Sequence, residues 1–376
     1  MQQAFVGADV FDGANLHKDA VLLVQGGRVS GILGHIPSGA QEVRLSGGTL
    51  APGFVDLQVN GGGGEMVGAA TDAAALARLC ALHGRLGATG IMPTLITDTP
   101  EVTARVIAAG IEAAQSGVAG FLGLHLEGPH LDPRRKGAHD AKLIRPMTES
   151  DLSQLCQAAR DLPALMVTLA PASVTEKQIA QLADAGVIVS LGHSEATCAE
   201  ARAAIAAGAR CATHLFNAMS PLGNREPGLV GAVLSSTLAA GVIADGHHVA
   251  IETLRVALAA RPEGLFLVSD CMAVAGSKAQ EFLLGGRKIL RRDGRLMLED
   301  GTLAGADLTL PRAVQVMVQE VGLPLDRALG MVTRTPSELL RNDRLARLIP
   351  GAFADLVHLN ADLGLESVWR TGLQLR

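Results

Sequence analysis

Residues 121–131 read FLGLHLEGPHL, an apolar run that ends on a carboxylate, Glu127. A short apolar run bounded by turn residues is typical of a strand that is buried on both faces. Gly128 and Pro129 follow at once, so we expect the chain to leave the strand there. Glu127 would then lie at the carboxyl-terminal end of a parallel strand, where the reacting groups of α/β enzymes gather.

Seven further runs of this kind occur along the chain, and Ala-rich stretches with helical spacing separate most of them. The eight runs are GFVDLQV, TGIMPTL, FLGLHLE, LMVTLAP, VIVSLGH, RCATHLF, GVIADG and LFLVSD. Strands that alternate with helices in this number predict an α/β fold whose parallel sheet closes into a (β/α)8 TIM-like barrel. A doubly wound open sheet is the alternative.

The two ends of the chain differ from this central part. Residues 1–50 contain short β-type runs such as AVLLVQGGRVSGIL, and residues 346–376 contain ADLVHLN and SVWRTGLQL. We therefore predict that residues 1–50 and 346–376 form the two parts of a small β domain, and that residues 51–345 form the barrel.

Composition excludes several classes of protein. No run approaches the roughly 18 consecutive apolar residues of a membrane span, and a net charge of -5 with no Tyr and one Trp argues against nucleic-acid binding. Five cysteines without a CxxC pair indicate neither a disulfide framework nor a cysteine zinc site. GGGG at 61–64 lacks the GxGxxG pattern of dinucleotide binding. The amino terminus, MQQAFVGADVFDG, lacks a secretory signal pattern, so we expect a cytoplasmic location.

Ionisable residues end four of the predicted strands: Glu127, His193, His214 and Asp270. Two imidazoles and one carboxylate are a ligand set of catalytic zinc sites, which leave one position for water. Asp270 would take a proton from that water and later deliver it to a leaving group, so the pattern predicts metal-assisted hydrolysis. Each residue alone also has a plain structural role, as a hydrogen-bonded histidine or a helix cap. Their recurrence at equivalent strand ends favours the catalytic interpretation.

Neighbouring positions narrow the metal prediction. His125 lies two residues before Glu127, and we expect it to be packed below the site. Asp56, Gln58 and Asn60 share one face of the first strand, and because none is an imidazole we predict one divalent metal ion per chain. Zinc suits the ligands, and iron, cobalt or manganese would also bind them.

Seven blocks of the sequence resemble the amidohydrolase superfamily, and within it the N-acetylglucosamine-6-phosphate deacetylases. They are APGFVDLQVNGGGG (51–64), HLEGPHLDPRRKGAHD (125–140), LGHSEA (191–196), THLFNAMSPLGNREPGLVGA (213–232), ADGHHV (244–249), VSDCM (268–272) and LAGA (303–306). The resemblance covers nearly the whole chain. It implies a barrel with a small β-sandwich domain built from both termini, one divalent metal ion, and removal of acetate from N-acetylglucosamine 6-phosphate to leave glucosamine 6-phosphate.

The resemblance also implies roles for individual residues. Glu127, His193 and His214 would bind the metal, and Asp270 and His139 would be catalytic, with His139 polarising the acetyl carbonyl group. The substrate would be bound by Ala138, His139, Asn217, Ala218, Arg225, His248, Leu303, Ala304 and Gly305. Arg225 and His248 suit the phosphate. In this family a neighbouring subunit supplies part of the phosphate site, so a homodimer is expected.

Several alternatives stay open at this point. N-acetylgalactosamine 6-phosphate differs from the expected substrate at one hydroxyl group, and the residues do not distinguish the two. A catalytically silent barrel that only binds a ligand is the alternative from another class. Arg134, Arg135 and Lys136 lie near the predicted site, and we expect at least two of them to be solvated.

Overall fold

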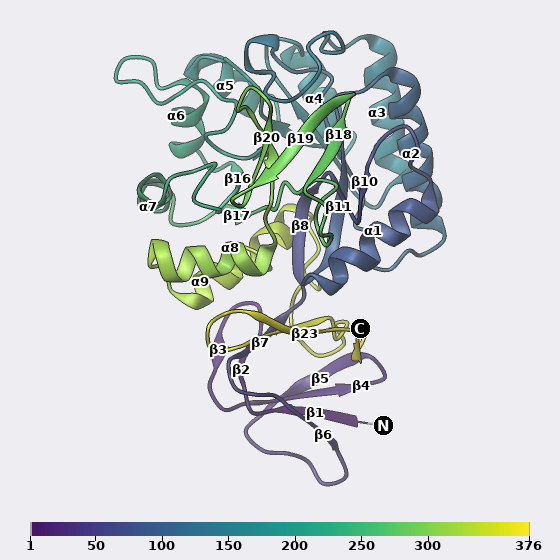
Figure 1. Cartoon of the computed structure of the whole chain (residues 1–376), viewed down its shortest axis with the longest axis vertical. Coiled ribbons are helices and arrows are strands. Elements are labelled where there is room, and N and C mark those ends of the chain that lie inside the picture. Colours follow the sequence, from purple (N-terminus) through teal and green to yellow (C-terminus); the bar gives the residue numbers. More distant parts are fainter. Residues whose placement is uncertain (1, 376) are drawn as a thin grey trace.

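Eight parallel strands form a barrel in the centre of the molecule, which a computed structural model describes over residues 2–375 (Figure 1). In chain order they are β8 (Phe54–Val59), β11 (Ala88–Ile96), β12 (Leu124–Glu127), β13 (Leu165–Leu169), β14 (Ile188–Leu191), β15 (Cys211–Ala212), β16 (Ala239–Val242) and β17 (Leu265–Leu267). Each pairs in parallel with the next along the chain. The predicted strand order is confirmed.

The first strand and the chain that follows the last strand close the barrel. Val59 forms a parallel bridge with Cys271. The backbone N–H of Asp270 donates to the carbonyl of Gln58 at 3.0 Å, and that of Asn60 donates to the carbonyl of Cys271 at 3.0 Å. A doubly wound open sheet would leave these groups at two separate edges, so that alternative is wrong and the barrel is confirmed.

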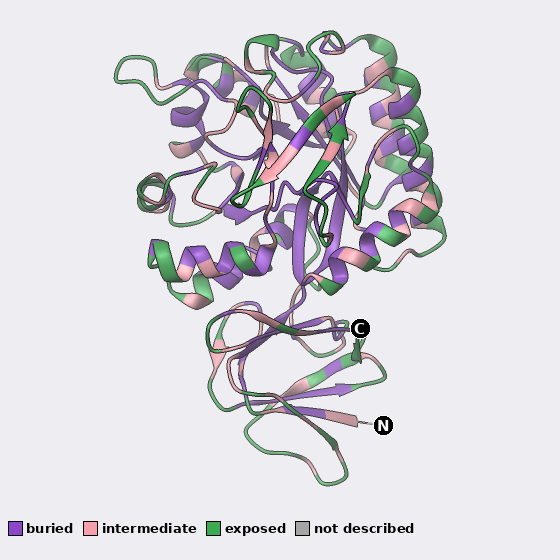
Figure 2. Cartoon of the chain, in the orientation of Figure 1, coloured by how far each residue is buried: buried purple, intermediate pink, exposed green. Residues whose placement is uncertain are grey.

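Helices cover the outside of the barrel, and their buried residues face the strands (Figure 2). They are α1 (Ala73–Arg85), α2 (Pro100–Gln115), α3 (Glu149–Asp161), α4 (Glu176–Asp184), α5 (Cys198–Ala206), α6 (Gly228–Leu234), α7 (Ile251–Ala260), α8 (Leu310–Val316), α9 (Leu325–Gly330) and α10 (Arg334–Leu339). Four begin after a threonine whose hydroxyl accepts from the backbone N–H three residues later: Thr99, Thr148, Thr175 and Thr197. These caps define locally where a helix starts. No helix within residues 2–375 is both long and apolar enough to cross a membrane.

A small β domain is built from both ends of the chain and lies below the barrel (Figure 1). One sheet contains β1 (Gln2–Val6), β4 (Val21–Gln25), β5 (Arg28–Leu33) and β6 (Gln41–Arg44). The other contains β2 (Asp9–Phe11), β3 (Leu16–His17), β7 (Thr49–Pro52), β22 (Leu356–Leu359), β23 (Leu365–Arg370) and β24 (Leu373–Gln374). Phe5 and Trp369 meet edge to face between the sheets, with ring centroids 5.3 Å apart. The β-sandwich is confirmed, and the chain divisions after residues 50 and 345 stay a prediction.

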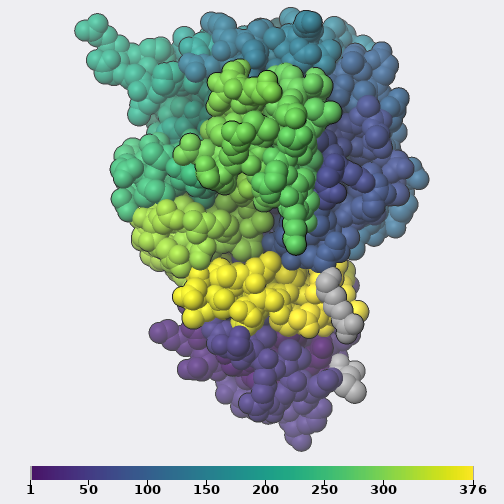
Figure 3. Space-filling view, viewed as in Figure 1, coloured from purple at the N-terminus to yellow at the C-terminus, as the bar shows by residue number. Residues whose placement is uncertain are grey.

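The sequence pattern did not reveal a further four-stranded sheet, which lies across the barrel in green in Figures 1 and 3. It contains β18 (Glu281–Leu284), β19 (Arg287–Arg292), β20 (Arg295–Leu298) and β21 (Leu303–Ala306). We call this insertion, residues 281–306, the lid sheet. Leu284, Ile289 and Leu296 pack in one cluster with Met272 from the carboxyl end of the barrel. The other lid residues mix apolar side chains with glycines and exposed charged residues, so no clear apolar alternation marks the strands.

Phe5→Ala should destabilise the β-sandwich by about 3–5 kcal/mol, because it empties a fully buried aromatic site. Trp369 is the only tryptophan and lies in this core, so its fluorescence during urea unfolding reports on the sandwich directly. Leu373→Ala, at a side chain that is 72% exposed, is the matched control and should change stability by less than about 0.5 kcal/mol. Equal shifts in both variants would contradict this packing.

Candidate active site

Three strand ends place a carboxylate and two imidazoles in one small volume. Glu127 is the last residue of β12, and His193 and His214 follow β14 and β15 by two residues. Nε2 of His214 lies 3.0 Å from Oε1 of Glu127 and 3.1 Å from Nε2 of His193. Nε2 of His193 lies 3.3 Å from the same carboxylate oxygen. All three side chains are buried.

The chemistry and spacing of these three atoms fit a tetrahedral metal ion. Nδ1–H of His193 donates to the backbone carbonyl of Arg135 at 2.8 Å, so its Nε2 carries the lone pair that a cation requires. Ligand atoms at 2.0–2.1 Å from a tetrahedral zinc ion stand about 3.3 Å apart, close to the spacing observed. Nδ1 of His214 is one of the few buried polar side-chain atoms within residues 2–375 that lack a hydrogen-bond partner. It is Nε2 of His214, and not this nitrogen, that faces Glu127 and His193.

His139 belongs to the same cluster but presents a different group. Its ligand atom and those of Glu127 and His193 all lie within 4.8 Å of one another. The backbone N–H of Thr97, however, donates to Nδ1 of His139 at 3.3 Å. Since this nitrogen accepts a hydrogen bond, Nε2 carries the proton, and it lies 3.7 Å from Oε2 of Glu127. His139 is therefore arranged as a hydrogen-bond donor.

The first strand orients the two carboxylates through its amide side chains. Nδ2 of Asn60 donates to Oδ1 of Asp270 at 2.7 Å, and Nε2 of Gln58 donates to Oε1 of Glu127 at 3.1 Å. From the sequence, Gln58 and Asn60 are notable only because they are not imidazoles. In the closed barrel, each of them positions a carboxylate.

Burial and neighbouring charges shift the pKa values of the clustered groups. Burial raises the pKa of Asp270 to about 6, and the charge of Glu127 adds to this effect. Burial would also raise the pKa of Glu127, but the neighbouring imidazoles of His193 and His214 hold it well below its ordinary value. Burial lowers the pKa of His139 to about 3, so this imidazole is neutral near pH 7. A neutral histidine can donate one hydrogen bond and remain uncharged.

His125 is packed below this cluster, as predicted. Its side chain is buried between the carbonyl of Leu57, 3.0 Å from Nδ1, and the hydroxyl of Thr168, 2.7 Å from Nε2. Burial lowers its pKa to about 4. The imidazole has both nitrogens occupied and none free for a cation.

Strained backbone is concentrated at the same place. His193, His214, Ala218 and Asp270 have φ angles of 45°, 32°, 50° and 47°. Non-glycine residues adopt this left-handed region at a cost of about 1–3 kcal/mol each, and they cluster where function requires a fixed side chain. The chain leaves three strands through these conformations, which turn the two imidazoles and the Asp270 carboxylate toward one centre.

A cavity of about 230 Å³ opens above the cluster, between the barrel and the lid sheet. Of the residues predicted to form the site, those that line it are Glu127, Ala138, His139, His193, His214, Asn217, Ala218, His248, Asp270, Leu303 and Gly305. Lining residues that the sequence argument did not assign are Asn60, Ile96, Gly137, Ile243, Met272, Leu284 and Thr302. Most of these are apolar and carried no signal in the sequence.

Two predicted substrate residues lie elsewhere. Ala304 is fully buried in the apolar cluster of the lid sheet, between Leu303 and Gly305, and contact of its backbone with the substrate stays a prediction. Arg225 is exposed on a loop that projects from the barrel before α6. This loop forms the protrusion at the upper left of Figure 3.

The three basic residues after Asp132 mostly have partners of their own. Arg134 pairs with Asp132 at 2.7 Å, and Arg135 forms an ion pair with Glu195. Lys136 is exposed, and its ammonium group contacts only the adjacent carbonyl of Gly137, at 3.3 Å. Arg134 and Lys136 are exposed to solvent, as expected for at least two of the three, and Arg135 is half-buried.

The amidohydrolase family model matches residues 49–371, which include the whole barrel and every residue of the cluster. The chain is an amidohydrolase. It is therefore a hydrolase, and the alternative of a catalytically silent binding protein is set aside.

Relatives of this amidohydrolase carry specific names. The chain is 38% identical over 372 residues to an N-acetylgalactosamine-6-phosphate deacetylase of Shewanella sp. (strain ANA-3), covering 97% of this chain and 94% of that protein. It is 32% identical to the N-acetylglucosamine-6-phosphate deacetylase of Haemophilus influenzae, covering 95% and 94%. The crystal structure of that enzyme from Pasteurella multocida superimposes with a TM-score of 0.95 at 34% identity, over 100% and 99% of the two chains.

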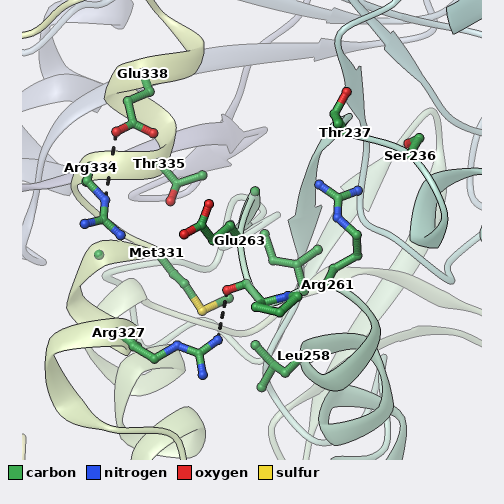
Figure 4. A pocket seen from close by; sticks show the side chains of 14 residues that line it. Ser236, Thr237, Leu258, Arg261, Glu263, Arg327, Met331, Arg334, Thr335 and Glu338 are labelled. Carbon is green, nitrogen blue, oxygen red and sulfur yellow. Dashed lines mark hydrogen bonds and ion pairs between the residues drawn. The ribbon is translucent and has the colours of Figure 1, made fainter.

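A larger cavity, of about 830 Å³, lies at the opposite end of the amidohydrolase barrel, beside α9 and α10 (Figure 4). Arginines line it, but their guanidinium groups are already engaged. Arg261 donates to the carbonyls of Val233 and Leu238, Arg327 donates to that of Pro262, and Arg334 lies 3.9 Å from Glu338. The loops here precede strands, where barrel enzymes place stabilising rather than reacting residues.

Proposed function

We propose that this amidohydrolase hydrolyses the acetamido group of N-acetylglucosamine 6-phosphate to glucosamine 6-phosphate and acetate. One observation carries the proposal: Glu127, His193 and His214 converge within 3.3 Å beside Asp270, in a cavity large enough for a sugar. Relatives named for this reaction, at 32–35% identity, support the substrate class. A mutant of the Mycobacterium smegmatis enzyme, 35% identical, has been crystallised with N-acetylglucosamine 6-phosphate.

One divalent metal ion per chain, which we propose to be zinc, would be held by Glu127, His193 and His214. When bound, such an ion supplies a Lewis acid that polarises a carbonyl oxygen and lowers the pKa of water. The family supports a divalent metal ion. Gln58 keeps Glu127 in place, and Arg135 fixes the ring of His193 through its carbonyl.

Asp270 would transfer the protons of the reaction. Asn60 occupies its Oδ1, so Oδ2 is the oxygen left to face the cavity. In the first step this carboxylate takes a proton from the attacking water, and in the second it gives the proton to the amide nitrogen as the C–N bond breaks. A pKa raised to about 6 suits a group that must both accept and donate a proton near neutral pH.

His139 would stabilise the negative charge that develops on the acetyl oxygen. Its ring lines the cavity with Nε2 3.7 Å from Oε2 of Glu127, and the backbone N–H of Thr97 favours the tautomer with the proton on Nε2. A neutral donor held in place before the reaction stabilises an oxyanion without a cost of reorganisation. Asn217, Ala218, His248, Leu303 and Gly305 would hold the sugar.

Arg225 would bind the phosphate of a substrate in the neighbouring subunit, which makes the functional unit a homodimer. Its guanidinium group lies outside the cavity of its own chain and has no ion pair among the residues described. A projecting loop that carries an unused cation suits a role in a partner's site. A cytoplasmic location stays a prediction.

N-acetylgalactosamine 6-phosphate is the second candidate substrate. It is favoured by the Shewanella relative, whose 38% identity exceeds that of the glucosamine-specific relatives described above. The two sugars differ in the configuration of one hydroxyl group, and both fit the same proton-transfer chemistry.

Acetate release from both 6-phosphates should be measured on the purified enzyme. We expect turnover that a chelator abolishes and zinc restores, with a higher kcat/KM for the glucosamine form. Asp270→Asn should lose at least about 10²–10⁴-fold in kcat while it keeps its metal, because the proton carrier is removed and the ligands are not. Activity that survives chelation, or no acetate from either sugar, would refute the proposal.

Metal analysis of alanine variants should show which of the three histidines in the cluster bind the ion. His193→Ala and His214→Ala should lose the ion, whereas His139→Ala should retain about one ion per chain and lose activity, since its Nε2 carries a proton. If His193→Ala retained the ion and His139→Ala lost it, the roles assigned to these two histidines would be reversed.

Mixing two inactive variants should test the shared phosphate site. Arg225→Ala and Asp270→Asn chains, co-expressed in equal amounts, form mixed dimers in about half of all pairs. Each mixed dimer would contain one intact site, so we expect about a quarter of wild-type activity at low substrate concentration. If Arg225 served its own chain, no intact site would form and no activity would return.

A further inference from the structure

The cavity has no positive charge of its own to meet a phosphate group. Among the described residues that line it, none is lysine or arginine, whereas Glu127 and Asp270 are carboxylates. A dianion placed here would be repelled unless cations at the rim compensate for its charge. Arg225 of a neighbouring subunit would supply one such cation under the proposed function.

The lid sheet, which lines part of the cavity, carries further cations. Residues 287–295 read RKILRRDGR, five cations in nine residues of a chain whose net charge is -5. Three of them are engaged: Lys288 lies 3.0 Å from Glu281, Arg291 lies 2.7 Å from Asp307, and Arg287 donates to the carbonyl of Ala138. Arg292 and Arg295 have no carboxylate partner among residues 2–375.

Arg295 differs from Arg292 in what it contacts. Its Nε donates to Nδ1 of His247 at 3.2 Å, and its two terminal nitrogens make no hydrogen bond within residues 2–375. His247 is the neighbour of His248, which lines the cavity. The guanidinium group is thus attached beside the histidine that we assign to the phosphate, with its terminal N–H groups available.

A tight turn holds this arrangement in place. Asp293 and Gly294 join β19 to β20 with φ angles of 50° and 71°, the conformation of a two-residue hairpin turn. A Cβ atom on Gly294 would lie 3.5 Å from Nε2 of His247, so the turn packs directly on that ring. β19 crosses the front of the barrel toward the segment before α7, which contains His247 (Figure 1).

Asp245 orders the opposite side of the contact. Its Oδ1 accepts from the backbone N–H groups of both His247 and His248, at 2.8 Å each. Its Oδ2 lies 2.7 Å from Nδ1 of His248, which leaves Nε2 of that ring for the cavity. This carboxylate thus holds His247, the contact of Arg295, next to His248, which lines the cavity.

We propose that Arg295 is a phosphate-binding residue contributed by the chain's own lid sheet, and that it acts together with His248. This inference rests on the proposed function, since it assumes a sugar phosphate as the substrate. A guanidinium group binds phosphate through two parallel hydrogen bonds, so Arg295 would contribute to substrate preference as well as to closure of the lid sheet.

Kinetics of Arg295→Ala test the assignment, with Arg292→Ala as the matched control from the same strand pair. We expect Arg295→Ala to raise KM for N-acetylglucosamine 6-phosphate at least about tenfold with little change in kcat. Its kcat/KM for unphosphorylated N-acetylglucosamine should stay within about twofold of wild type, because that substrate lacks the phosphate. Arg292→Ala should match wild type for both substrates.

Two outcomes would overturn the inference. Equal losses in both variants that disappear at high salt would indicate general electrostatic steering by the lid sheet rather than a contact. An unchanged KM in Arg295→Ala, with wild type active, would exclude a contact of any kind.

Calorimetric binding of inorganic phosphate to the metal-loaded enzyme provides a readout that does not need turnover. Phosphate binding at least about tenfold weaker in Arg295→Ala than in Arg292→Ala supports the site. This holds even if the enzyme hydrolyses neither sugar phosphate, because that failure would refute only the proposed function. Equal phosphate affinity in the two variants overturns the inference.

Discussion

Closure of the barrel between β8 and the chain after β17 is the constraint on which the site depends. The hydrogen bonds that close it set the register of Gln58 and Asn60 against the segment that contains Asp270. That register brings the Asn60 amide to the Asp270 carboxylate, 210 positions away in sequence. The pairing of β8 with β11 and of β11 with β12 brings the Gln58 amide to Glu127. Main-chain pairing thus holds residues that are distant in sequence within hydrogen-bond distance of each other.

Hydrogen bonds give the three imidazoles and the carboxylate of the cluster different roles. His193, His214 and Glu127 direct lone-pair atoms at one point, whereas His139 accepts from Thr97 and so presents a proton. Residue type alone would allow any of the three histidines to bind a cation. For His193 and His139 the backbone partner of the ring indicates its tautomer, and the tautomer decides its chemistry. The left-handed backbone at His193, His214 and Asp270 shows that this orientation is maintained against local strain.

The lid sheet adds what the barrel lacks. The barrel end supplies carboxylates, imidazoles and apolar walls, and the insertion between β17 and α8 supplies cover and cations. Its apolar side, with Leu284 and Ile289, packs in one cluster with Met272 of the barrel, while Lys288, Arg292 and Arg295 are exposed. A small apolar cluster is enough to hold a polar sheet over the site, which keeps the insertion separable from the core of the barrel.

The sequence by itself determined the eight-stranded barrel, the sandwich of both termini and the strand-end residues Glu127, His193, His214 and Asp270, because buried parallel strands leave continuous apolar runs and their ends stand out as isolated charges. The tertiary structure alone decided the lid sheet, the roles of Gln58, Asn60 and Thr97, and the exposed place of Arg225. Each of these depends on contacts between segments far apart in the chain. Local periodicity carries no information about such contacts, whereas strand register and loop packing specify them.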